Sequence, residues 1–262
     1  GVEEDGRYVT ESRLKKMLSH EVSLIEKRLS REKHPNKMFF SYANTVATID
    51  FAKQFKGHGW VGIRYQIEPD EDYNEIVIHI RFKETDVKLQ QETLGILGVN
   101  LIYGAFYKYN DSKKLLRYLY DHLDKDQLEI DTINFSGPRF ADVDNRLMSL
   151  QLVKNGMTDA VMFNPEGKNI LPAAILYKKN ILALRGSFRP VTSVNIDMFK
   201  KSYELFIQEN KVDKENTLVV SEITLSNLRS EGEIDERDFM DRAELLCSLG
   251  QTVMISNFQE YY

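Results

Sequence analysis

Apolar residues recur at helical spacing in six stretches of the chain. In the first, from Glu11 to Leu29, they lie three or four residues apart, a pattern typical of an amphipathic helix. The stretch 94–107 is the longest apolar run of the chain, which favours a helix buried within the protein. The predicted helices are 11–29, 94–107, 112–123, 145–155, 195–210 and 234–249.

Short runs of alternating or β-branched apolar residues predict strands. Residues 59–67 and 75–82 are joined by the polar segment EPDEDYN, so we expect them to form a hairpin. The runs 158–164, 171–177 and 181–188 are separated by the short segments NPEGKN and YKKN, which indicates a strand meander rather than a helical crossover. The remaining predicted strands are 127–136, 217–225 and 252–257.

This order of elements predicts the α/β fold class, with two parts. We expect residues 1–192 to form a mixed α+β domain with antiparallel hairpins and a buried helix. From residue 193 helices and strands alternate, which is typical of parallel strands joined by helical crossovers. Because the sequence stops at FQEYY, where another helix would begin, 193–262 is interpreted as the start of an incomplete α/β portion, and the chain as a fragment of a longer one.

Composition narrows the classes of function. With 262 residues, of which 42% are hydrophobic and 29% charged, the chain has the balance of a folded globular protein. Its net charge of −5 argues against nucleic acid as the main ligand, because phosphate contacts need clustered lysines and arginines. The most apolar run, 94–107, contains Asn100 and is shorter than the roughly 20 residues of a membrane helix, so we expect no membrane partner. Homo-oligomer formation stays open.

Cysteine content bears on the compartment. The single cysteine, Cys247, excludes an intramolecular disulfide and a paired-cysteine zinc site. The first residues lack the apolar core of a secretion signal. The expected localisation is therefore cytoplasmic.

The segment RGSFRP, from Arg185 to Pro190, is the strongest candidate for an anion contact. Gly186 allows backbone conformations in which successive amides point toward one ligand, and Ser187 can donate a hydrogen bond. Arg185 and Arg189 add charge and bidentate hydrogen bonds to a phosphate or carboxylate. The alternative is a turn whose arginines pair with acidic side chains of the protein.

Side-chain alternation along the predicted hairpin places Arg64, His79 and Arg81 on one face beside Trp60. His79 is the candidate catalytic base, because a base next to cations that hold an anion is chemically useful. In KGHGWVG, glycines flank His58 and allow a mobile loop, from which Trp60 can stack on a planar ligand. The alternative is that Trp60 covers the edge of the core.

The segment FSGPRFADVDNR follows a predicted strand end and offers Arg139 and Arg146 as further ligand contacts. Its Asp142 and Asp144 could hold Mg²⁺ through carboxylate oxygens, although the segment lacks the glycine and terminal glutamate of a calcium loop. The alternative is that Asp144 or Asn145 caps the helix that follows.

Two further carboxylates are candidate catalytic groups. Asp131 shares a strand face with Glu129, and paired carboxylates can divide the acid and base roles. Glu222 lies in the apolar strand VVSEITL, where an acid needs either a partner or a role in an active site. An exposed strand face, or an edge position in the sheet, would explain both residues without catalysis.

Several blocks of the sequence together resemble a known family: FFSYANTVATIDF, HGWVGIRYQ, LQQETLGILGVNLIYGAFY, FSGPRFADVDNRLMSLQLVKNGMTDAVMF and LYKKNILALRGSFRPVT. The family consists of long bacterial proteins, found among Bacteroidetes and elsewhere, that often carry the labels nicotinate-nucleotide adenylyltransferase or TonB-dependent receptor. The similarity covers almost the whole chain. The adenylyltransferase label implies an H-x-x-H or H-x-G-H pair and a Ser-Thr-x-x-Arg loop, whereas HGW at His58 has no second histidine and the loop is absent. The resemblance therefore assigns no catalytic residues.

The sequence thus predicts a protein that binds a phosphate- or carboxylate-bearing small molecule. If it is an enzyme, the expected activity is that of a transferase acting on a nucleotide-like or phosphorylated metabolite, with Mg²⁺ as the cofactor that its residues suggest. The competing hypothesis is a non-catalytic assembly or scaffold domain in which the same arginines pair with acids.

Overall fold

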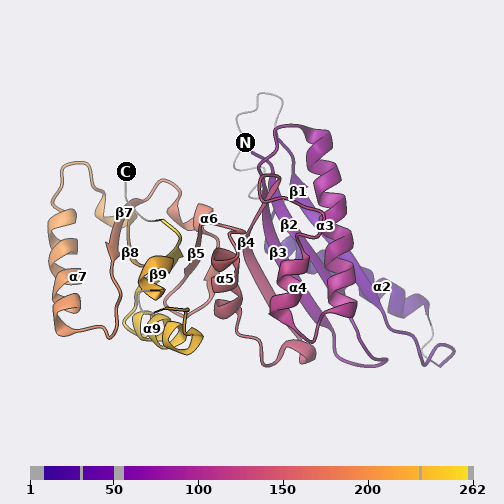
Figure 1. Cartoon of the computed structure of the whole chain (residues 1–262). Coiled ribbons are helices and arrows are strands. Elements are labelled where there is room, and N and C mark those ends of the chain that lie inside the picture. Colours follow the sequence, from indigo (N-terminus) through magenta and orange to yellow (C-terminus); the bar gives the residue numbers. More distant parts are fainter. Residues whose placement is uncertain (1–8, 30–31, 50–55, 230–231, 259–262) are drawn as a thin grey trace. The chain divides into compact units, whose positions relative to one another are not determined.

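The computed structural model describes residues 9–29, 32–49, 56–229 and 232–258 (Figure 1). It divides the chain into two compact units, Gly1–Met148 (unit 1) and Ser149–Tyr262 (unit 2). Each unit combines helices with a sheet, so the predicted α/β class is confirmed. In the described part of the chain, no helix combines the length and the apolar character that a membrane span requires.

Unit 1 is built on a four-stranded antiparallel sheet with the order β1-β2-β3-β4. β2 and β3 form the predicted hairpin, in which Trp60 lies opposite His79. β1 has no counterpart among the predicted strands. The strands are β1 (Phe40–Ala47), β2 (His58–Tyr65), β3 (Asn74–Phe82) and β4 (Leu128–Ser136).

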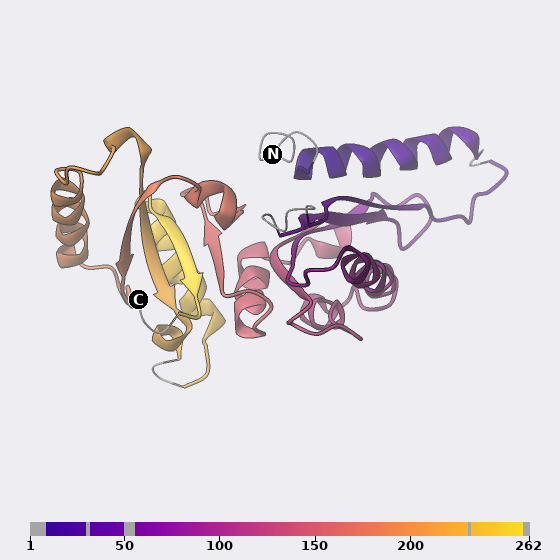
Figure 2. The same cartoon turned by 90° about the horizontal axis from the view of Figure 1, so that it is seen from above.

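Helices cover both faces of this sheet (Figure 2). α2 turns one stripe of apolar residues onto the first face, where Leu14 and Leu18 pack against Gly62. α3 and α4 lie on the second face, where Gly98 allows the close approach of Tyr42. The helices are α2 (Glu11–Arg28), α3 (Val87–Tyr107), α4 (Ser112–Tyr118), the 3-10 helix η1 (Pro138–Phe140) and α5 (Asn145–Lys154), which continues into unit 2.

A β-bulge interrupts the pairing between β3 and β4. His79 lies opposite Thr132, while the next residue, Ile80, lies opposite Ile130. Asp131 is therefore the extra residue on β4, and a bulge of this kind re-aims the side chain that it carries. Here it brings the carboxylate of Asp131 to His79.

Unit 2 contains a five-stranded sheet with the order β6-β5-β9-β8-β7. β7, β8 and β9 run parallel with helical connections, as the alternation after residue 193 predicts. β5 and β6 extend the sheet in the antiparallel sense. The strands are β5 (Ala160–Phe163), β6 (Asn169–Ile170), β7 (Asn180–Arg185), β8 (Thr217–Thr224) and β9 (Thr252–Ser256). The helices are α6 (Pro172–Leu176), α7 (Ser193–Phe206), η2 (Lys214–Asn216), α8 (Leu225–Leu228) and α9 (Glu236–Ser248).

The predicted strand at 171–177 is wrong, and with it the meander. The segment forms helix α6 with Pro172 in its first turn, where the fixed φ of proline suits a helix and its missing N–H is not needed. β7 consequently pairs with β8 rather than with the strands that precede it. A short apolar run without clear periodicity is compatible with either state.

The boundary between the two units lies between Met148 and Ser149 and not, as the sequence predicts, at residue 192. β5 pairs with β9, with Ala160 opposite Ser256, so the residues from Ser149 onward belong to unit 2. A pairing between segments so distant in sequence leaves no local signal at either strand.

Two glycines provide a matched test of the packing in unit 1. A Cβ at Gly59 would lie 2.6 Å from the carbonyl oxygen of Thr45 and from Cα of Val46, whereas nothing lies within 4 Å of a Cβ at Gly95. We expect Gly59→Ala to lower the free energy of unfolding by about 1–3 kcal/mol through overpacking. Gly95→Ala, inside α3, should raise it by about 1 kcal/mol, because alanine favours the helix. Urea unfolding followed by the fluorescence of Trp60, the single tryptophan, measures both changes, and equal effects would contradict this packing.

Candidate functional site

A chain of hydrogen-bonded side chains links three strands of unit 1. Oδ1 of Asp131 on β4 lies 2.7 Å from Nδ1 of His79 on β3, and Nε2 of His79 lies 3.2 Å from Nδ1 of His58 on β2. The ring of Trp60 lies beside them, with its centroid 4.8 Å from that of His79. The strands thus bring together four of the residues that the sequence proposes for a site. We call Asp131, His79 and His58 the histidine chain.

The inner members of the histidine chain are buried. His79 is 2% and Asp131 is 4% exposed, while His58 is half-buried. Burying a carboxylate is unfavourable unless hydrogen bonds replace its water, and the Nδ1–H of His79 supplies such a bond. His58 is therefore the member that solvent reaches most readily.

The arginines predicted beside His79 are not bound to it. Nη1 of Arg64 lies 2.5 Å from Oε1 of Glu75, and the guanidinium lies 4.7 Å from the ring centroid of Tyr73. Arg81 is exposed and lies two register pairs further along the sheet than His79, opposite His58. The group bound to His79 is thus a carboxylate and not the predicted pair of cations.

In unit 2, the partly exposed guanidinium of Arg185 forms an ion pair with the buried carboxylate of Glu222 near the ends of β7 and β8. Nε and Nη2 of Arg185 lie 3.0 and 3.1 Å from the two carboxylate oxygens of Glu222, which is fully buried. Ser256, on β9, donates a further hydrogen bond to Oε1 at 2.5 Å. Glu222 therefore has the partners that a buried acid requires, and its charge is balanced within the unit.

Ion pairs and hydrogen bonds connect the rest of the RGSFRP turn to α9. Nε of Arg189 lies 3.0 Å from Oδ1 of Asp238, which also binds Arg242. Nη1 of Arg242 donates to the carbonyl oxygen of Ser187 at 3.1 Å. The backbone amide of Gly186 donates to the carbonyl oxygen of Glu222 at 3.1 Å. Both arginines of the predicted anion contact thus already bind carboxylates of the protein.

The loop after β4 is held by ion pairs of its own. Arg139 binds Oε1 of Glu68 at 3.0 Å and Oε1 of Glu71 at 2.5 Å. Asp144 accepts the backbone N–H of Arg146 at 2.8 Å, as expected of a residue that caps α5, and the guanidinium of Arg146 binds it at 2.9 Å. Burial pushes the pKa of Asp144 up, but the hydrogen bonds from Arg146 outweigh this effect, so the pKa lies below its ordinary value.

The described residues supply no third ligand for an Mg²⁺ ion at Asp142 and Asp144. Asp142 is exposed, and Asp144 is bound by Arg146. Within the described residues, no three His, Cys, Asp or Glu side chains are placed to hold one metal ion. Helix capping accounts for Asp144.

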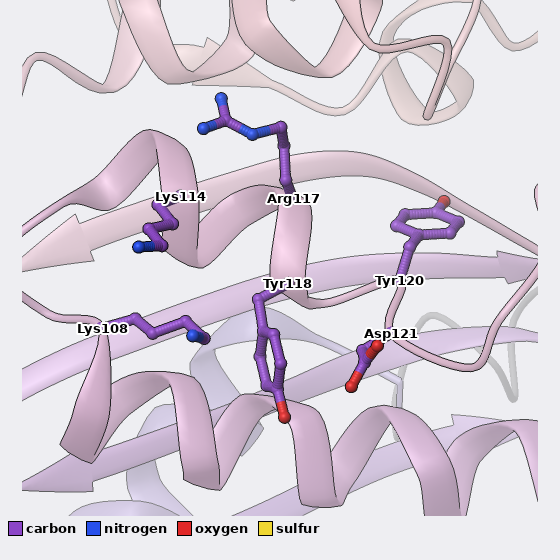
Figure 3. A pocket seen from close by; sticks show the side chains of 6 residues that line it. All are labelled: Lys108, Lys114, Arg117, Tyr118, Tyr120 and Asp121. Atoms are coloured by element: carbon purple, nitrogen blue, oxygen red, sulfur yellow. The ribbon is translucent and has the colours of Figure 1, made fainter.

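An open hollow of about 360 Å³ lies beside α4 in unit 1 (Figure 3). Leu115 and Leu116 are buried on one side of α4, which directs Lys114 and Arg117 to the other side. Lys108 joins them from the turn between α3 and α4. The residues that line this basic hollow are Lys108, Lys114, Arg117, Tyr118, Tyr120 and Asp121.

The basic hollow carries an excess of positive charge, since three of its lining residues are cationic and one, Asp121, is anionic. Nζ of Lys108 lies 4.5 Å from the ring centroid of Tyr118, a cation–π contact (Figure 3). Lys114 and Arg117 form no ion pair with any carboxylate in the described part of the chain. Their charge is therefore available to a ligand.

None of the residues that line the basic hollow is among the site residues predicted from the sequence. Its signal in the sequence is the segment KYNDSKKLLRYLYD, in which cations alternate with tyrosines and Lys114 and Arg117 are three residues apart on a predicted helix. The same pattern is typical of an ordinary solvated helix face. Only the structure shows that Lys114 and Arg117 border a hollow and that neither is bound to a carboxylate of the described residues.

Comparisons with family models, with curated proteins and with solved structures each find no match for this chain. The functional argument therefore depends on the geometry of the sites alone.

The buried pair Arg185–Glu222 yields a stability prediction. We expect Arg185→Ala to lower the free energy of unfolding of unit 2 by about 3 kcal/mol or more, because Glu222 keeps a buried charge without its guanidinium. As a matched control, Lys201→Ala removes the exposed ion pair with Glu204 and should change stability by at most about 0.5 kcal/mol. Hydrogen exchange of the β8 amides measures both. Equal protection in the two variants would show that the buried pair does not stabilise the sheet.

Proposed function

We propose that this chain binds a phosphate- or carboxylate-bearing small molecule in the basic hollow of unit 1. The observation that carries the proposal is the pair Lys114 and Arg117, which point to one side of α4 and form no ion pair in the described part of the chain. A guanidinium can bind two oxygens of one anion, and an ammonium adds a compact charge beside it.

The size of the hollow fits a small ligand. Its volume of about 360 Å³ lies in the lower part of the range found for small-molecule sites. Tyr118 and Tyr120 add aromatic surface next to the cations, which suits a ligand that joins an anionic group to a ring. The hollow is open, so a ligand could enter without a large rearrangement of unit 1.

The RGSFRP turn supports anion binding less well. A ligand there would compete with the carboxylates of Glu222 and Asp238 for Arg185 and Arg189. Removing a guanidinium from a buried carboxylate is unfavourable. We therefore assign the anion contact to Lys114 and Arg117 instead.

A finer form of the proposal is that the ligand is a nucleotide-like metabolite and that the protein transfers one of its groups. The alternative function is a non-catalytic assembly or scaffold domain. The pairs Arg185–Glu222 and Arg189–Asp238 favour this alternative, because they give the arginines a structural role. Ligand binding distinguishes the two functions.

Isothermal titration calorimetry with inorganic diphosphate, citrate and a nucleoside triphosphate tests the proposal. We expect at least one of these anions to bind, and Lys114→Ala combined with Arg117→Ala to weaken it about tenfold or more, since charged hydrogen bonds contribute about 1.5–3 kcal/mol each. The charge-matched control combines Lys16→Ala with Lys125→Ala, both exposed and outside the hollow. It should change the affinity by no more than about twofold, as expected for exposed charges that solvent screens and that do not line the hollow.

Two results would overturn the proposal. If none of the anions binds, the scaffold function is the better description. If Arg185→Ala with Arg189→Ala abolishes binding while the double variant of the hollow binds normally, the site lies at the RGSFRP turn.

A further inference from the structure

We propose that the outer edge of β1 is the interface of a homodimer, in which β1 of one copy pairs antiparallel with β1 of a second copy across a two-fold axis. This surface is separate from the basic hollow, because α3 approaches β1 at Gly98 and α4 at Gly104. Three features carry the proposal: the hydrogen-bonding phase of β1, its uncharged sequence and a groove between β1 and α3.

Alternate residues of β1 direct their backbone groups away from the sheet. The amide of Gln66 donates to the carbonyl oxygen of Phe39, so these opposite residues form a hydrogen-bonded pair. Hydrogen-bonded and non-hydrogen-bonded pairs alternate along an antiparallel ladder, so every second residue from Ser41 to Ala47 bonds to β2. The N–H and C=O groups of the residues between them point to the outer edge, where no described strand pairs with them. These outward-pointing residues are Phe40, Tyr42, Asn44 and Val46.

β1 differs from a protected edge strand. Edge strands are ordinarily kept from pairing with other molecules by charged residues, by proline or by a bulge. β4, on the opposite side of the same sheet, follows this rule with Glu129 and the bulge at Asp131. β1, with the sequence FSYANTVA, has eight residues without a charge or a proline, and its pairing with β2 is regular. Its edge is therefore a template for another strand.

The surface beside this edge is uncharged as well. Tyr42 and Asn44 of β1 and one side of α3, which includes Gly95 and Val99, line an open groove of about 340 Å³. None of the described residues that line the groove is charged. Val99 is 66% exposed, and Phe40 at the start of β1 is 44% exposed. Association that covers these apolar side chains is favourable, because it removes them from water.

The charge of the chain favours a second copy as the occupant. Each chain has a net charge of −5, so two copies repel each other except where they meet at an uncharged surface. The β1 edge is such a surface, and in a symmetric dimer it faces an identical uncharged edge. The two-fold axis also makes the two strands antiparallel, which is the more stable form of ladder.

One register pairs all four outward-pointing residues. In it Tyr42 lies opposite Asn44 of the second copy, and Phe40 lies opposite Val46 of the second copy. Ala43 lies at the two-fold axis, where the two copies of this residue form a non-hydrogen-bonded pair with Cα atoms about 4.5 Å apart. Val99 is also close to the axis, because its neighbour Gly98 approaches the ring of Tyr42.

Sedimentation velocity over a range of concentrations tests the dimer. We expect the unaltered 30.5 kDa chain to sediment as a dimer. Val99→Glu should raise the dissociation constant about tenfold or more, because it places two like charges across the axis. The matched control is Val194→Glu on α7 of unit 2, which alters a residue that is 74% exposed and should leave the constant within about twofold. Equal effects of the two variants would overturn the proposal. So would a chain that stays monomeric, which would leave this edge to an unrelated peptide or to no partner.

Disulfide cross-linking tests the register. In a Cys247→Ser background, Ala43→Cys places two thiols within reach, since a disulfide joins residues whose Cα atoms lie about 4.4–6.8 Å apart. The control is Thr48→Cys, because this exposed residue follows β1 and its two copies would lie about 33 Å apart at about 3.3 Å per residue. Oxidised glutathione should give a covalent dimer of the Ala43→Cys chain and none of the Thr48→Cys chain. A covalent dimer of both chains or of neither would contradict the pairing of β1 with β1.

Discussion

A carboxylate that is buried within a sheet needs a hydrogen-bond or ion-pair partner, because it has lost its water. Each unit of this chain contains one such carboxylate, and neighbouring strands supply its partner. In unit 1 the carboxylate is Asp131, which the bulge on β4 brings to His79. In unit 2 it is Glu222, which binds Arg185 on one neighbouring strand and Ser256 on the other. An unpaired charge in such a place would cost several kcal/mol, which is comparable with the net stability of a domain. The two pairings therefore fix the register of the strands that carry them.

These internal pairs also decide which charges remain for function. The sequence proposes Arg185 and Arg189, and after them Arg139 and Arg146, as anion ligands, yet each binds a carboxylate of the protein. Lys114 and Arg117 differ from them, because the described residues offer them no such partner. The distinction between a structural arginine and a binding arginine is thus a matter of the neighbours that the fold supplies.

Much of the fold could be predicted because its signals are local. The β2–β3 hairpin follows from alternating residues around a polar turn, and α9 follows from apolar residues at helical spacing. What could not be predicted depends on distant partners. The pairing of Ala160 with Ser256 moves the division of the chain, and Pro172 begins a helix inside an apolar run that also suits a strand.

The candidate sites, like the fold, could be predicted only as far as their signals are local in the sequence. The sequence proposes His79 and Asp131 from residue type and alternation, and His58 from the glycines that flank it. The contact between Asp131 and His79 depends on one extra residue in β4 that no local pattern reveals. Glu222 was recognisable as an acid in need of a partner, but the sequence does not identify Arg185 as that partner. Recognising the basic hollow required the direction of side chains around α4 and the finding that no carboxylate of the described residues forms an ion pair with Lys114 or Arg117.

The central claim is that the positive charge available to a ligand lies on α4 and not at the RGSFRP turn. The most direct measurement is a titration of the ¹⁵N-labelled chain with inorganic diphosphate, followed through the backbone amide shifts. The account predicts saturable shifts concentrated between Lys108 and Asp121, with little change from Arg185 to Arg189. Shifts concentrated at Gly186 to Arg189, with residues 108–121 unaffected, would contradict it.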